Sequence, residues 1–309
     1  MPNARWPRVG ASRRDSFAIG RGDRVADLRY AAALFFKGRV GDDPDAEARD
    51  LIAAVLDKPR FWPTLHPNTR LGESAITRIC EATIARVRGA PFAYAVGRAS
   101  FRHLTLDVDD RVLIPRQETE VLVDVVLEWA AARGAGGLAI DVGTGSGAIA
   151  LALANEGAFD RVIATDVSTG AVRVARANAE RLAGALHAPV DIRQGALLAP
   201  VRGEMARVVV SNPPYIAYGE MRELPSSVRD WEPPTALYAG DGGMAVIAAL
   251  AREAATVLEP GGLLATEIDC RRGAACAELL RAQGCYHDVR VRPDLTGRDR
   301  VLTATRQDG

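Results

Sequence analysis

The regular alternation of short apolar segments with longer amphipathic segments, from residue 138 onwards, is the feature that most constrains the fold. Short apolar strands separated by helices are typical of a parallel sheet covered by helices on both faces. We expect strands at residues 138–142, 161–165, 190–193, 207–211, 262–267, 286–291 and 300–305. The last two strands follow one another without an intervening helix, so they can pair antiparallel at the end of the sheet.

The region before this alternation predicts a separate helical domain. Apolar residues recur at three- and four-residue steps in residues 28–36, 48–56 and 76–87, and prolines and glycines separate these runs. Asp45, directly after Pro44, is the expected cap of the second helix. We therefore predict a small bundle of helices.

Changes of pattern along the chain predict the domain boundaries. The first residues are rich in Arg, Gly, Ser and Pro and can bury little apolar surface, which predicts disorder; a basic arm that contacts nucleic acid is the alternative. Apolar and polar residues alternate over residues 94–114, which predicts a hairpin, and an amphipathic helix is expected over 118–133. The predicted parts are a disordered arm, a helical domain that docks the substrate, a hairpin linker and a sheet domain, at residues 1–24, 25–92, 93–116 and 117–309.

Composition excludes several classes of function. The chain carries 39 basic and 39 acidic side chains, so no overall positive field draws it onto nucleic acid or an anionic membrane. No apolar stretch reaches the roughly 20 residues that span a bilayer, and no signal sequence is visible, so we expect a cytoplasmic protein. The cysteines and histidines lack the short paired spacings of a metal site. We predict reduced cysteines, no metal, no membrane and no direct binding of nucleic acid.

A glycine-rich turn leaves the first strand of the sheet and opens the next helix, at Asp141, Gly143, Thr144, Gly145, Ser146 and Gly147. Glycines let the backbone approach a ligand closely, and the helix N-terminus offers free N–H donors, so the turn predicts a cofactor site. The spacing Gly143-x-Gly145-x-x-Ala148 also fits a dinucleotide. Asp166 ends the second strand, where its carboxylate would accept hydrogen bonds from the ribose hydroxyls of either cofactor.

Asp141 favours one of these two cofactors. An acid two residues before the first glycine can meet the cationic methionine part of S-adenosylmethionine, directly or through water, whereas it would repel a pyrophosphate. Leu197 follows the third strand, where the adenine ring would lie. Packing of Leu197 on that ring and packing in the core are equally compatible with the sequence.

The segment Asn212-Pro213-Pro214-Tyr215 follows the fourth strand and determines the predicted chemistry. Consecutive prolines fix an extended backbone, so the Pro213 carbonyl is held rigidly beside the Asn212 side-chain oxygen. Two such acceptors can hold both N–H bonds of an –NH2 group and raise the electron density on its nitrogen as a methyl group approaches. Tyr215 would stack on the planar group. The segment fits an amide and the amino group of adenine equally well.

Together these motifs resemble those of the protein N5-glutamine methyltransferases, most closely the release factor glutamine methyltransferases. The motifs occur in the family's order at residues 114–120, 141–147, 211–216, 232–237, 241–243 and 294–301. The segment Gln117-Glu118-Thr119-Glu120 is similar to the release-factor group, whereas a sister group that methylates a ribosomal protein typically has Ser-Pro there. The resemblance covers residues 25–306.

The resemblance implies an α/β fold, a seven-stranded and mostly parallel class I S-adenosylmethionine-dependent methyltransferase sheet with a small N-terminal helical domain. It assigns S-adenosylmethionine to residues 143–147, Asp166, Leu197 and Asn212, and the substrate glutamine to residues 212–215. The implied substrate is the glutamine of the Gly-Gly-Gln segment of peptide chain release factors, whose methylation assists termination of translation. The alternatives are glutamine methylation of a ribosomal protein, adenine-N6 methylation of nucleic acid, and a non-catalytic nucleoside-binding protein.

Two positions depart from the family pattern. Ala196 stands where an acid often follows the third strand, which affects a contact to the adenine amino group. Glu267-Ile-Asp269 replaces the usual Glu-x-Gly after the fifth strand, which alters a turn near the mouth of the substrate site.

Overall fold

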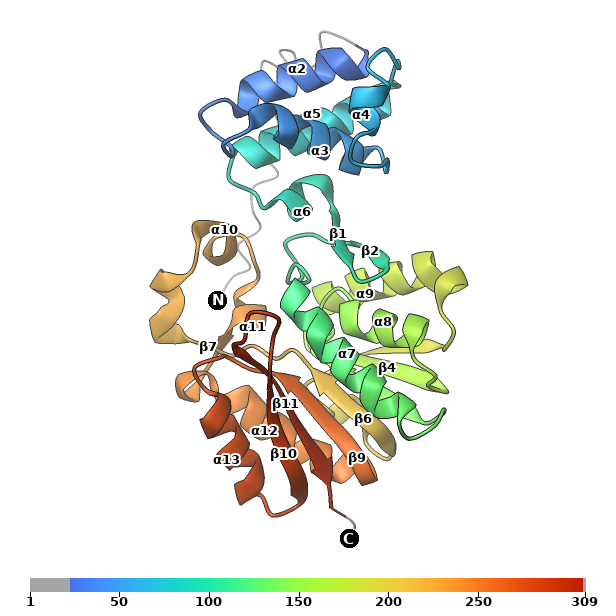
Figure 1. Cartoon of the computed structure of the whole chain (residues 1–309), viewed down its shortest axis with the longest axis vertical. Coiled ribbons are helices and arrows are strands. Elements are labelled where there is room, and N and C mark those ends of the chain that lie inside the picture. The colour runs from blue at the N-terminus through green and yellow to red at the C-terminus, as the bar shows by residue number, and fades with distance from the viewer. Residues whose placement is uncertain (1–22, 308–309) are drawn as a thin grey trace. The chain divides into compact units, whose positions relative to one another are not determined.

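The computed structural model describes residues 23–307 and separates into two compact units, Met1–Arg98 and Ala99–Gly309 (Figure 1). Residues 1–22 of the predicted arm lie outside the described residues. Asp23 and Arg24 are described, and the N–H of Leu71 donates a 2.7 Å hydrogen bond to the Asp23 carbonyl. These two residues therefore belong with the helical unit and not with the predicted arm.

The predicted helices of the first unit are confirmed. Its long helices within the described residues are α2 (Val25–Phe36), α3 (Pro44–Val55) and α5 (Glu73–Val87), and the short ones are α4 (Trp62–Leu65) and α6 (Phe92–Val96). The apolar faces of the long helices meet in one core, which includes Val25, Leu28, Phe36, Leu51, Ile52 and Ile79. This unit therefore has a hydrophobic core of its own.

The prediction that Asp45 caps α3 is wrong. The side chain of Asp43 accepts a 3.0 Å hydrogen bond from the N–H of Ala46, and Pro44 is the first residue of the helix. Proline suits that first position because its fixed φ is helical and its missing N–H has no partner to lose there. The capping side chain must precede it, so the cap lies two residues before the predicted one.

The predicted hairpin is present but shorter. Strands β1 (Arg98–Phe101) and β2 (Leu104–Asp107) form a two-stranded sheet, whereas residues 94–96, expected to be extended, lie in α6. Gly97 ends that helix in a left-handed conformation with a φ of 73°. Asn178, on a helix of the sheet unit, bonds the N–H and the carbonyl of Asp107 at 2.7 and 2.9 Å, which attaches β2 to that unit.

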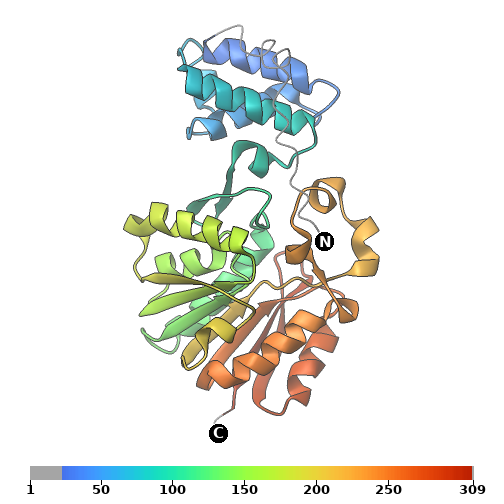
Figure 2. The same ribbon diagram turned by 180° about the vertical axis from the view of Figure 1, so that it is seen from behind.

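All the predicted strands of the sheet are present, in the order β10-β11-β9-β6-β3-β4-β5 (Figures 1 and 2). Their bounds are β3 (Leu138–Val142), β4 (Arg161–Asp166), β5 (Val190–Gln194), β6 (Ala206–Ser211), β9 (Leu258–Glu267), β10 (Tyr286–Pro293) and β11 (Asp299–Arg306). The first five run parallel. Strand β11 is antiparallel to both β9 and β10, which confirms the expected antiparallel end of the sheet.

Helices cover both faces of the sheet (Figures 1 and 2). They are α7 (Gln117–Ala131), α8 (Ala148–Glu156), α9 (Thr169–Leu182), α12 (Ala245–Val257) and α13 (Gly273–Ala282). Residues 148–154 of α8 are all buried, as expected of a helix packed against both a sheet and another helix, here α7. On the face covered by α12, Ile140 and Val209 share a core with Leu250. No helix within residues 23–307 is long and apolar enough to cross a membrane.

The chain between β6 and α12 brings two segments together. Strands β7 (Ile216–Ala217) and β8 (Tyr238–Ala239) pair in parallel. The connecting turns are η3 (Tyr218–Glu223), α10 (Ser226–Arg229) and α11 (Pro234–Leu237), η4 (Asp241–Gly243) follows β8, and η1 (Ala183–Ala185) and η2 (Ala199–Val201) flank β5. This pairing brings β8 back beside β7, which follows the end of β6.

Candidate active site

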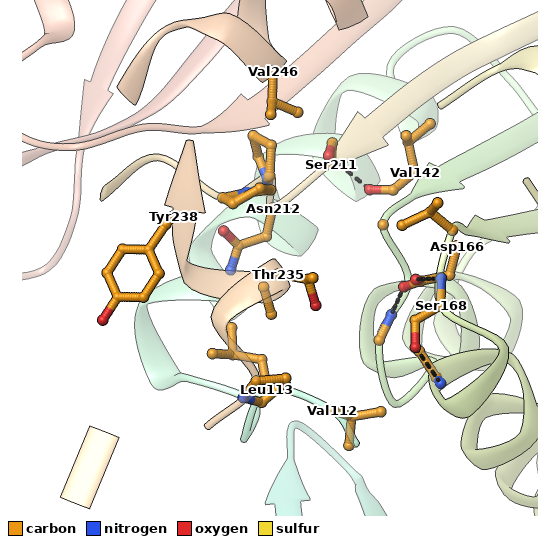
Figure 3. A pocket seen from close by; sticks show the side chains of 18 of the residues that line it. Val112, Leu113, Val142, Asp166, Ser168, Ser211, Asn212, Thr235, Tyr238 and Val246 are labelled. Carbon is orange, nitrogen blue, oxygen red and sulfur yellow. Dashed lines mark hydrogen bonds between the residues drawn. The ribbon is translucent and has the colours of Figure 1, made fainter. Parts of the chain in front are cut away.

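A cavity of about 460 Å³ opens at the carboxyl ends of β3, β4 and β6 (Figure 3). Val142, Asp166 and Ser211 end these strands and line the cavity. Strands β4 and β5 lie on one side of β3, and β6 lies on the other. In open α/β sheets this reversal of strand order leaves a crevice between diverging loops, where ligands bind.

The structure divides the predicted glycine-rich turn into residues that line the cavity, Gly143 and Gly145, and residues that do not, Thr144, Ser146 and Gly147. Gly143 and Gly145 have φ values of 74° and 57°, a left-handed backbone that favours glycine. The N–H groups of Gly143 and Thr144 donate to the Thr165 carbonyl at 2.8 and 2.9 Å, which fixes the turn to β4. Thr144 and Ser146 are buried. The cavity wall at this point is therefore glycine backbone, supported from behind by side chains.

Asp141 is fully buried in β3, beneath the turn, and does not line the cavity. Its Oδ2 accepts hydrogen bonds from Thr144 Oγ1 at 2.7 Å and from the N–H of Ala150 at 3.1 Å. Its Oδ1 has no partner within the described residues. Burial raises the pKa of Asp141 to about 7, although the bonds from Thr144 and Ala150 oppose that shift. A buried carboxylate oxygen without a partner is costly, and a cation or a water molecule would satisfy it.

Asp166 lines the cavity from the end of β4 (Figure 3). Its Oδ2 accepts a 2.9 Å hydrogen bond from the N–H of Gly145, and its Oδ1 accepts one of 2.8 Å from the N–H of Ser168. Burial raises the pKa of Asp166, and these two bonds oppose the shift. Each carboxylate oxygen can accept a further bond, so Asp166 can bind hydroxyl groups of a ligand while it holds the glycine turn.

Leu197 lines the cavity and also packs against the core cluster of the sheet. Its packing on an adenine ring stays a prediction. Its φ of 45° is uncommon for a leucine. The hydroxyl of Thr165 donates to the Leu197 carbonyl at 2.8 Å, and the Glu253 carboxylate accepts from the N–H of Leu198 at 3.0 Å. These bonds hold the leucine against the cavity.

Ala196 also lines the cavity, where its methyl group offers no hydrogen bond to a ligand.

The segment from Asn212 to Tyr215 separates two cavities. Asn212, Pro213 and Pro214 line the cavity described above. Asn212, Pro213 and Tyr215 line a second cavity of about 200 Å³, whose other walls include the apolar residues Ile216, Leu224, Val228 and Leu237. Asn212 and Pro213 therefore line both cavities.

Asn212 and Tyr215 are held by hydrogen bonds that the sequence did not predict. The Asn212 Nδ2 atom donates to Thr119 Oγ1 at 3.1 Å, and the Tyr215 hydroxyl donates to Glu267 Oε1 at 3.0 Å. Thr119 in turn donates to Glu267 Oε2 at 2.7 Å. Thr119 lies in a motif that carries the family resemblance, and Glu267 begins the segment Glu267-Ile-Asp269 that departs from the family pattern. No spacing rule links residues 148 positions apart.

Other residues lining the larger cavity were also missed. They come from the loop before α7 and from the return segment around α11, and include Arg111, Val112, Leu113, Pro233, Pro234, Thr235 and Tyr238. An ion pair between Arg116 and the buried Glu232 fastens these two segments to each other. Glu232, Pro233 and Pro234 belong to a motif that the sequence shows, at residues 232–237. This motif could have predicted that the segment lines the cavity.

Two family models match parts of the chain. The model of the PrmC N-terminal domain matches residues 27–97, and that of the methyltransferase small domain matches residues 117–224. The release factor glutamine methyltransferase of Moorella thermoacetica is 42% identical over 86% of this chain and 92% of its own length. That of Mycolicibacterium smegmatis is also 42% identical, over 92% of this chain and 97% of its own length.

The chain belongs to the release factor glutamine methyltransferase family. The resemblance inferred from the motifs is thereby confirmed. A solved methyltransferase from Pyrococcus furiosus shares the fold, with a TM-score of 0.51 and 20% identity over 77% of this chain and 100% of that one. The methyltransferase fold predicted for the sheet unit is also confirmed.

Proposed function

We propose that this chain is an enzyme that transfers a methyl group from S-adenosylmethionine to the side-chain amide nitrogen of a glutamine, in the Gly-Gly-Gln segment of peptide chain release factors. The observation that carries the proposal is the meeting of two cavities at Asn212 and Pro213. The larger cavity has room for a nucleoside cofactor, and the smaller one has room for a glutamine side chain. Methyl transfer needs this arrangement of two adjoining sites.

The residues of the larger cavity fit S-adenosylmethionine. The glycine backbone of residues 143 and 145 permits close approach, and the Asp166 carboxylate is placed to accept from the ribose hydroxyls. Leu197 would cover one face of the adenine ring. The unpartnered Oδ1 of Asp141 lies behind the turn, where a water molecule can connect it to the cationic amino group. When bound, this cofactor supplies a methyl group on a sulfonium sulfur, which leaves as a neutral thioether.

The Asn212 to Tyr215 segment would activate the substrate amide. An amide nitrogen is a weak nucleophile because its lone pair is delocalised into the carbonyl. The Asn212 Oδ1 atom and the Pro213 carbonyl would accept both N–H bonds, which localises electron density on nitrogen as its bond to the methyl carbon forms. The nitrogen becomes acidic after transfer, so its extra proton can pass to water without a strong protein base. Tyr215 lines the smaller cavity, where its ring would stack on the planar amide of the substrate.

We further propose that the helical unit and residues 217–231 dock the release factor. Tyr30, Leu34, Phe61 and Leu65 of the helical unit are large apolar side chains that remain exposed. Exposed apolar groups of this size are common in surfaces that bind other proteins. The enzyme would act in the cytoplasm, where release factors work, and would contact the release factor and no nucleic acid directly.

A transfer assay with several acceptors tests the proposed function. The chain is incubated with S-adenosylmethionine labelled in the methyl group and with purified release factor, ribosomal proteins or DNA. We expect label on the release factor alone. Label on a ribosomal protein or on adenine would assign the chain to one of the alternative substrates, and label on none of them, with the cofactor bound, would mean that it is not this methyltransferase.

A further inference from the structure

We propose that Thr119 and Glu267 are positioning residues that fix which end of the Asn212 amide faces the substrate. The inference rests on the proposed function, because the orientation of this amide matters only if it receives an N–H group. It adds residues from two further elements to the segment from Asn212 to Tyr215, since Thr119 lies in the first turn of α7 and Glu267 ends β9.

The three side chains form a continuous chain of hydrogen bonds. The Asn212 Nδ2 atom donates to Thr119 Oγ1 at 3.1 Å, and Thr119 Oγ1 donates to Glu267 Oε2 at 2.7 Å. The other oxygen of the same carboxylate, Oε1, accepts from the Tyr215 hydroxyl at 3.0 Å. One carboxylate therefore holds both ends of the Asn-Pro-Pro-Tyr segment.

The direction of these bonds follows from what each group can donate. An ionised carboxylate has only acceptors, whereas a threonine hydroxyl has one hydrogen and two lone pairs. The hydrogen of Thr119 is committed to Glu267, so Thr119 presents a lone pair to Asn212. Only the NH2 end of the Asn212 amide can bond to a lone pair, and the carbonyl end is left as the acceptor for the substrate. A flipped amide would face the substrate N–H with its own N–H.

The sheet explains why these groups meet. Strands β6 and β9 are neighbours in parallel register, with Ser211 beside Thr266. Asn212, directly after β6, and Glu267, the last residue of β9, therefore follow this pair. Thr119 and Glu267 have exposed fractions of 4% and 1%, which protects the bonds between them from water.

The groups around Glu267 influence whether its carboxyl is ionised and can act only as a hydrogen-bond acceptor. Burial raises the pKa of Glu267. The hydrogen bonds from Thr119 and Tyr215 oppose that shift, as does the charge of Arg300 on β11, whereas Glu118 on α7 adds to it. The two donors and the cation partly offset the effect of burial, which is the largest influence and leaves the pKa of Glu267 raised.

The test compares variants that keep or remove a single hydrogen-bonding group. Thr119→Val removes the hydroxyl and preserves the shape of the side chain, and Thr119→Ser keeps the hydroxyl. Thr83→Val is the matched control, because Thr83 is a fully buried threonine of the helical unit whose hydroxyl bonds only within its own helix, to the Ile79 carbonyl. For each variant, kcat and KM for the release factor and the affinity for S-adenosylmethionine are measured.

We expect Thr119→Val to lower kcat by about a hundredfold, the usual effect of losing one oriented group at a reacting centre. Thr119→Ser should recover most of that loss, and the cofactor affinity of both should stay within about twofold of the wild type. In an Asn212→Ala background, Thr119→Val should cause no further loss, since both changes remove the same oriented acceptor. Thr83→Val should retain the kcat of the wild type.

Glu267→Gln gives a second and independent measurement. Glutamine keeps the size of the side chain but replaces one acceptor with a donor, so kcat should fall while cofactor affinity is kept. The inference is overturned if Thr119→Val has the kcat of the wild type, if its effect adds in full to that of Asn212→Ala, or if both Thr119→Val and Glu267→Gln lose cofactor binding together with activity. A wild-type chain that binds the cofactor but leaves the release factor unmodified would instead refute the proposed function.

Discussion

Asn212 faces both cavities, and its two proposed roles can be separated by mutation. Replacing Asn212 with alanine removes one acceptor for the substrate amide, whereas the rest of the cofactor cavity is made by other residues. We expect transfer to fall by a factor on the order of a hundred to a thousand, and the affinity for S-adenosylmethionine to change little. Isothermal titration and a transfer assay on the same preparation give both numbers. Equal losses of binding and activity would show that Asn212 acts mainly on the cofactor.

Asp141 predicts a dependence of cofactor binding on pH. Its pKa is about 7 in the ligand-free protein, above the ordinary value of 3.8, so below that pH its carboxyl is mostly protonated. A cationic cofactor favours the ionised form, so the affinity should rise with pH up to the pKa, by at most about tenfold per pH unit, and then level off. Titrations on either side of the pKa, with Asp141→Asn as the control, measure this. The same slope in the variant would exclude Asp141 as the source.

The same pKa shift predicts how stability changes with pH. The folded protein holds the Asp141 proton more tightly than the unfolded chain, so this residue lowers stability as pH rises from 3.8 to about 7. Other acids contribute slopes of their own, so the informative quantity is the difference in unfolding temperature between the wild type and Asp141→Asn. That difference should grow in favour of the variant as pH rises, and a constant difference would contradict the raised pKa.

Among the short elements, η4 supports the Asn-Pro-Pro-Tyr segment through Gly243. A β-carbon at Gly243 would overlap the Tyr215 carbonyl oxygen, whereas one at Gly242 would meet nothing within 4 Å. Both glycines have positive φ, at 92° and 58°, so alanine strains the backbone at either. Gly243→Ala should displace Tyr215 and lower transfer by about a hundredfold, and Gly242→Ala should have a much smaller effect. Similar activities in the two variants would mean that backbone strain, and not the contact with Tyr215, matters here.

The sequence predicted elements better than it predicted their contacts. Periodicity is a local property, so all strands of the sheet and the four helices predicted by residue range were found within a few residues. The wrong predictions lie where one residue overrides the periodic pattern. Asp43, and not Asp45, caps α3 because Pro44 is the first residue of that helix. Gly97 ends a helix in a region that was expected to be part of the hairpin.

For the candidate site too, the sequence predicted individual residues better than the contacts between them. Asn212 and Asp166 were identified because they follow strands, and both line the cavity. The hydrogen bond between Thr119 and Glu267 joins residues distant in the chain, and the packing of α7 against β9 brings them together. Local patterns hold no information about such contacts.

At the scale of the whole molecule, the two units predict a division between docking and chemistry. Tyr30 and Leu34 lie one turn apart on α2 and are 69% and 52% exposed, so replacing both with serine should cost little stability. If they dock the release factor, the double variant should raise KM for the intact protein by about tenfold. Transfer to a short Gly-Gly-Gln peptide should not change.

Met205 provides the control for this docking experiment. It is 52% exposed and precedes β6 at the amino edge of the sheet, opposite the cavities. Met205→Ser therefore removes a comparable apolar side chain from outside the proposed surface and should leave both substrates unaffected. A double variant that behaves like Met205→Ser would exclude this face of α2 from docking.

The central claim is that the junction of the two cavities methylates a glutamine amide. It is tested most directly by mass spectrometry of release factor incubated with the enzyme and S-adenosylmethionine, with a release factor carrying glutamate in place of the Gly-Gly-Gln glutamine as the control. We predict the mass of one added methyl group on that glutamine side chain and none on the control protein. A methyl group on another residue, or the same modification of the control, would contradict the account.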